Sequence, residues 1–101
     1  METLIAYLEN LKNSIPVNCT LFNLQRLKIN WTEFKNFLTS LPSHLETLKS
    51  SFLQRLELLK LKIESIEANF GGAYNARFAF QEACGQLKAE MDAAMLSLQE
   101  Q

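Results

Sequence analysis

The feature that most constrains this chain is a series of large apolar residues separated by alternating steps of three and four. In the segment 24–41 the series is Leu24, Leu27, Trp31, Phe34, Leu38 and Leu41. This spacing places the side chains on one face of an α-helix, and it is typical of a helix that packs lengthwise against another helix. We therefore predict an all-α protein.

Similar spacing recurs in three other parts of the chain, with one extra step of four between Phe52 and Leu56. A short stripe of Leu4, Leu8 and Leu11 lies near the N-terminus. Longer stripes are Leu45, Leu48, Phe52, Leu56, Leu59, Ile63, Ile66 and Phe70, and then Phe80, Cys84, Leu87, Met91, Ala94 and Leu98. We predict helices at about 3–13, 20–41, 44–70 and 73–99, the third ending at Gly71-Gly72. The 101 residues favour one domain, 1–101.

Pro42 raises the question of whether the segment 24–70 is one kinked helix or two helices joined by a turn. A proline inside a helix costs about 3 kcal/mol, because it removes a hydrogen bond and clashes with the preceding turn. Ser43 and Glu46 also fit a capping box that starts a new helix. We predict a turn, with a kinked continuous helix as the alternative. The resulting fold is an up-down bundle of one short and three long helices with coiled-coil-like packing.

The three long helices carry further apolar residues on the faces away from these stripes. They are Phe22, Ile29, Phe37, Leu58, Leu61, Phe78 and Leu96. A helix on the outside of a monomeric bundle needs only one apolar stripe, so we expect these residues to form a partner or self-association interface. A homodimer is the simplest such assembly. The alternative is that they are ordinary surface residues, or that the short first helix covers some of them.

The residues that usually carry catalysis are sparse and scattered. His44 is the only histidine, and Cys84 lies on an apolar stripe, where a thiol behaves as a small hydrophobic group. The sequence contains no glycine-rich phosphate loop, serine elbow or zinc-protease motif. We therefore expect no enzyme activity, no cofactor, no metal site and no small-molecule substrate.

Basic residues concentrate between positions 26 and 62, where seven basic residues face three acidic ones. An alternative function is therefore a nucleic-acid-binding helical dimer that contacts phosphates. Its candidate contact residues are Arg26, Lys28, Lys35, Arg55, Lys60 and Lys62. The overall net charge of −1 does not favour nucleic acid or an anionic membrane, and we expect no membrane partner.

The N-terminal stretch METLIAYLENLKNSIP lacks the basic start and the apolar run of a signal peptide. No apolar stretch is long enough for a membrane span. We therefore expect an intracellular protein, in the cytoplasm or nucleus, with reduced Cys19 and Cys84. The alternative is a secreted helical-bundle ligand with a Cys19–Cys84 disulfide. The triplets Asn18-Cys19-Thr20 and Asn30-Trp31-Thr32 match the glycosylation pattern and are read as chance matches.

Taken together, the patterns favour a non-enzymatic helical interaction or oligomerisation module. We expect it to act as an adaptor or assembly element, and its partner to be a second copy of the chain or another protein.

Overall fold

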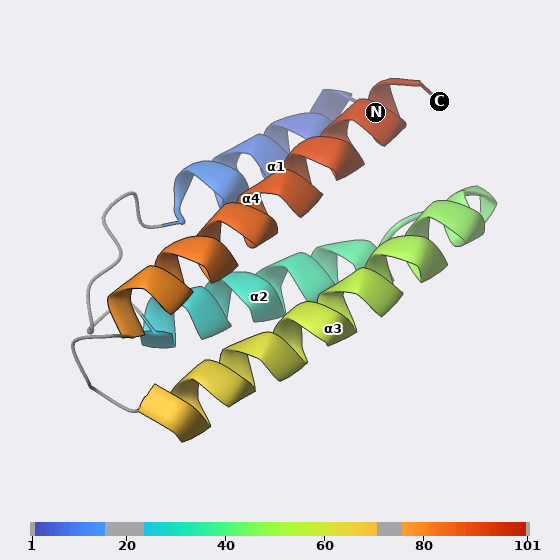
Figure 1. Cartoon of the computed structure of the whole chain (residues 1–101). Helices are drawn as coiled ribbons and strands as arrows, with labels where there is room; N and C mark the ends of the chain where they lie inside the picture. The colour runs from blue at the N-terminus through green and yellow to red at the C-terminus, as the bar shows by residue number, and fades with distance from the viewer. Residues whose placement is uncertain (1, 16–23, 71–75, 101) are drawn as a thin grey trace.

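The computed structural model describes residues 2–15, 24–70 and 76–100, and within them the chain forms four α-helices and no β-strand (Figure 1). The helices are α1 (Glu2–Asn13), α2 (Leu24–Thr39), α3 (Glu46–Phe70) and α4 (Ala76–Gln99). The prediction of an all-α protein is confirmed. The paired glycines Gly71-Gly72 lie outside the described residues.

The four helices pack around one another. Contacts join α1 to α2, α2 to α3, α3 to α4 and α4 to α1, and α2 also contacts α4 across the bundle, whereas α1 and α3 do not meet within the described residues. Successive helices run in opposite directions, so that α1 begins and α4 ends at the same end of the molecule (Figure 1). Every helix therefore turns one side toward a shared interior and another toward solvent.

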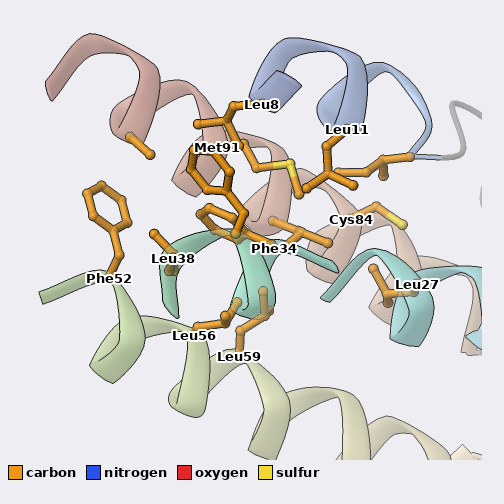
Figure 2. Close-up of a cluster of buried hydrophobic side chains, with 14 of the residues drawn as sticks. Leu8, Leu11, Leu27, Phe34, Leu38, Phe52, Leu56, Leu59, Cys84 and Met91 are labelled. Atoms are coloured by element: carbon orange, nitrogen blue, oxygen red, sulfur yellow. The ribbon is translucent and has the colours of Figure 1, made fainter. Parts of the chain in front are cut away.

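The interior is filled by the apolar stripes of all four helices. Its most deeply buried side chains include Leu8 of α1, Phe34 of α2, Leu56 of α3 and Met91 of α4 (Figure 2). The α4 stripe from Phe80 to Leu98 is buried along its length, and on α3 the stripe is buried from Phe52 to Ile66. Burying a large apolar side chain is worth about 1.5–3 kcal/mol, so these stripes supply the main driving force for the fold.

The proline question is answered by a turn. α2 ends at Thr39, a short 3₁₀ segment (η2) covers Ser43–Leu45, and α3 then runs back alongside α2. The Leu45 N–H donates to the Pro42 carbonyl over 2.9 Å, which closes this segment.

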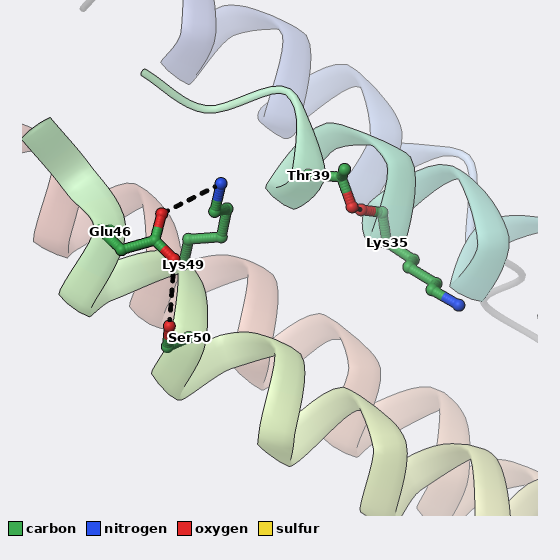
Figure 3. A network of polar contacts seen from close by, with 5 residues as sticks. All are labelled: Lys35, Thr39, Glu46, Lys49 and Ser50. Atoms are coloured by element: carbon green, nitrogen blue, oxygen red, sulfur yellow. Dashed lines mark hydrogen bonds and ion pairs between the residues drawn. The ribbon is translucent and has the colours of Figure 1, made fainter. Parts of the chain in front are cut away.

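The capping box predicted for the start of α3 is wrong. The Glu46 carboxylate lies 3.1 Å from Lys49 Nζ and 3.5 Å from Ser50 Oγ, one turn further along the helix (Figure 3). The physical reason is the 3₁₀ turn, which moves the start of the α-helix to Glu46. The glutamate therefore occupies the first turn of α3 and not the third position after a serine cap.

Candidate interaction surface

Four large apolar side chains are exposed on α3 and α4, and we call this set of residues the α3–α4 surface. It contains Leu58 (68% exposed) and Leu61 (55%) from α3, with Phe78 (63%) and Leu96 (58%) from α4. These two helices contact each other more extensively than any other pair of helices in the fold. The same helices thus fill the core with one stripe and present a second set of apolar residues to solvent.

Two ion pairs cross between α3 and α4 and fix how the helices align. Arg55 Nη1 lies 3.1 Å from Glu90 Oε2, and Lys62 Nζ lies 2.6 Å from Glu82 Oε1. Leu58 lies between the two basic residues in sequence, one helical turn from each. Beside it is a shallow hollow of about 340 Å³, lined by Arg55, Leu58, Leu59, Lys62, Gln86, Ala89 and Glu90. The hollow is therefore an apolar depression bordered by paired charges.

The other predicted interface residues do not lie on this surface. Ile29 is 52% exposed but belongs to α2, a different helix of the fold. Phe37 is only 4% exposed, which corrects its placement on a partner interface. Its ring stacks on Tyr7 of α1, with centroids 5.5 Å apart and an interplanar angle of 16°, because the short first helix packs over this side of α2. Phe22 lies outside the described residues.

Three of the six predicted nucleic-acid contacts are already paired with carboxylates. Arg55 and Lys62 pair with α4 as described, and Lys28 Nζ lies 2.6 Å from Glu67 Oε2 of α3. The positive charge of the segment 26–62 is thus offset by acidic residues that come later in the sequence. These pairs weaken the electrostatic case for phosphate binding, which depends on unpaired cations.

Of the remaining three basic residues, two lie beside the Trp31 ring and the third lies elsewhere on α2. Lys35 and Lys60 Nζ lie 5.4 and 5.6 Å from the centroid of the Trp31 ring, within the range of a cation–π contact. Arg26 is exposed on α2 and forms no ion pair with another described residue. The six cations therefore do not gather into one positive surface.

Sequence reasoning missed one buried polar residue, Asn30, which is 2% exposed. Its Nδ2 donates to Ser14 Oγ over 2.7 Å, and this hydroxyl donates to the Leu11 carbonyl over 2.6 Å. The Asn30 Oδ1 atom is buried and has no hydrogen-bond partner in the part of the chain that the structure describes. Because a glycan acceptor must reach solvent, this burial agrees with reading the Asn30-Trp31-Thr32 triplet as a chance match.

The histidine and the described cysteine considered for catalysis or redox chemistry do not share one site. His44 is exposed in the turn before α3, Cys84 is buried at 4% exposure in α4, and Cys19 lies outside the described residues. Within residues 2–15, 24–70 and 76–100, His, Cys, Asp and Glu form no group of three or more that could hold a metal ion. None of the described helices has the length and apolar character to cross a membrane.

Comparisons with protein-family models, with curated proteins and with solved structures found no match to this chain.

Proposed function

We propose that this chain is a non-enzymatic helical interaction module that self-associates through the α3–α4 surface and serves as an assembly element. The observation that carries the proposal is the exposure of Leu58, Leu61, Phe78 and Leu96, each above one half, on two adjacent helices. Such a group of large apolar residues on neighbouring elements is more typical of an interaction site than of ordinary surface.

The size of the surface fits a dimer of modest affinity. Each of the four side chains offers roughly 100 Å² of apolar area, or about 400 Å² together. A standard interface covers about 800 Å² per partner, somewhat more than half of it non-polar, which corresponds to about 450 Å². In this proposal the subunit is an up-down bundle, the contact between subunits resembles a coiled coil, and the module works inside the cell as an adaptor.

Two matched charge substitutions test the proposal. Leu58→Glu places a carboxylate on the α3–α4 surface, one turn from Arg55 and Lys62, so helix α3 tolerates it. Ile29→Glu removes a similar apolar area and adds the same charge on α2, away from this surface. Because an interface anchor is worth about 2 kcal/mol or more, Leu58→Glu should weaken self-association at least tenfold, whereas Ile29→Glu should leave it nearly unchanged.

The measurement is sedimentation equilibrium of the purified chain over a wide range of concentration. Circular dichroism of both variants checks that the helices are retained. A wild-type chain that stays monomeric at every concentration contradicts the proposal. So does a dimer that Ile29→Glu weakens as much as Leu58→Glu does.

A further inference from the structure

The outer face of α3 carries a second series of residues with coiled-coil spacing, distinct from the buried stripe. Its members are Ser51, Gln54, Leu58, Leu61, Ser65 and Ala68, separated by steps of three, four, three, four and three. All lie within α3, and all except the half-buried Ser51 are exposed. Two leucines occupy the centre, and the small side chains of Ser51, Ser65 and Ala68 toward the two ends allow close approach of another helix.

Opposite charges flank the two leucines of this series. At about 100° per residue, Glu57 and Glu64 lie along one side of the series, and Arg55 and Lys62 lie along the other. When the residues of this series are assigned the a and d positions of a heptad repeat, the two glutamates occupy g positions. The two basic residues then occupy e positions. Charges at e and g positions set the partner and orientation of helices that pair.

The charge pattern distinguishes the two ways in which α3 can pair with α3 of a second copy about a two-fold axis. In a parallel pair the g side of one helix faces the e side of the other. Glu57 then lies opposite Lys62 of the second copy, five positions later, and this contact occurs twice. In an antiparallel pair the g side of one helix faces the g side of the other, and the e sides face each other. Glu57 then lies opposite Glu64 of the second copy, and Arg55 lies opposite Lys62, so that like charges meet.

We propose that the partner of the α3 outer face is a second copy of this chain, aligned in parallel, with Leu58 and Leu61 against their own counterparts. This inference rests on the proposed function and adds which helix face forms the contact and how the two copies are oriented. The Lys62–Glu82 pair within each chain does not prevent it. Glu82 and Lys62 retain 65% and 31% side-chain exposure, and one ammonium has three donors to share between two carboxylates.

Charge reversal at Glu57 has opposite effects in the two orientations. Glu57 is exposed and forms no ion pair with another described residue, so Glu57→Lys leaves the fold of the single chain intact. In the parallel dimer the new lysine faces Lys62, and we expect self-association to weaken about tenfold. In an antiparallel dimer it would face Glu64, and self-association would strengthen. Glu33→Lys on α2 is the control with the same change of charge.

A mixing experiment provides the second readout. Glu57→Lys and Lys62→Glu chains, each weakly associating alone, should form heterodimers preferentially when mixed, as measured by sedimentation or by fluorescence transfer between labelled chains. A dimer that Glu57→Lys strengthens or leaves unchanged overturns the parallel arrangement while self-association stands. A strictly monomeric wild-type chain overturns both proposals.

Discussion

The Trp31 indole of α2 donates its N–H to the main-chain carbonyl of Leu56, in the middle of α3, over 3.0 Å. The same ring receives Lys35 on its own helix and Lys60 from α3. One side chain therefore joins two antiparallel helices through a hydrogen bond, cation–π contacts and partial burial. Trp31 is consequently a residue of the α2–α3 junction more than of the central core.

We expect Trp31→Phe to lower the free energy of unfolding by about 1–2 kcal/mol. Phenylalanine keeps an apolar ring but has no N–H for the Leu56 carbonyl and binds cations more weakly. Urea denaturation followed by circular dichroism measures the change, because the substitution removes the only tryptophan. Lys60→Met is the control, since it keeps the hydrogen bond and should cost less than about 0.5 kcal/mol. Equal losses from both substitutions would contradict this assignment.

The Asn30–Ser14 contact should behave as a coupled pair. Ser14→Ala removes the only hydrogen-bond partner that the buried Asn30 side chain has among the described residues, and we expect a loss of about 1–3 kcal/mol. Asn30→Leu replaces the amide by an apolar group of similar size, which suits this buried position. In the Asn30→Leu background, Ser14→Ala should cost less than about 1 kcal/mol. A double-mutant cycle in urea gives the coupling energy, and strict additivity would contradict the prediction.

The sequence was sufficient to predict the helices because their apolar spacing is regular, but it could not show how wide each buried face is. On α2 the predicted stripe runs through Leu27, Trp31 and Phe34, whereas the buried face extends toward α1 to include Asn30 and Phe37. A helix with more than one neighbour buries a wider face than a single stripe, and α2 contacts α1, α3 and α4. Which side receives the second neighbour depends on the packing of α1, which no local pattern reveals.

For the candidate surface, too, the sequence could predict the exposed apolar residues but not the ion pairs beside them. Leu58, Leu61, Phe78 and Leu96 could be selected from the sequence because they lie far from the core stripes, and each is more than half exposed. The ion pairs Arg55–Glu90 and Lys62–Glu82 join residues 35 and 20 positions apart, and only the alignment of α3 with α4 brings them together.

Phe37 and Leu61 should respond very differently to truncation, although both were expected on an interface. Phe37→Ala removes a buried ring that packs on Tyr7, and we expect a loss of about 3–5 kcal/mol in the free energy of unfolding. Leu61→Ala removes an exposed side chain and should change stability by less than about 0.5 kcal/mol in dilute solution. Thermal and urea denaturation at low concentration measure both. A large loss for Leu61→Ala in the monomer would show that this residue supports the fold itself.

The ion pairs also predict how steeply nucleic-acid binding by this chain would depend on salt concentration. Three of the six candidate cations lack a carboxylate partner among the described residues, namely Arg26, Lys35 and Lys60. The logarithm of the binding constant should therefore fall with the logarithm of the salt concentration with a slope no steeper than about −3. Replacing Glu67, Glu82 and Glu90 by glutamine frees Lys28, Lys62 and Arg55, and the slope should steepen toward about −5. Fluorescence anisotropy with a labelled DNA duplex at several salt concentrations measures both slopes. A wild-type slope as steep as that of the triple variant would mean that the ion pairs open without cost when phosphate binds.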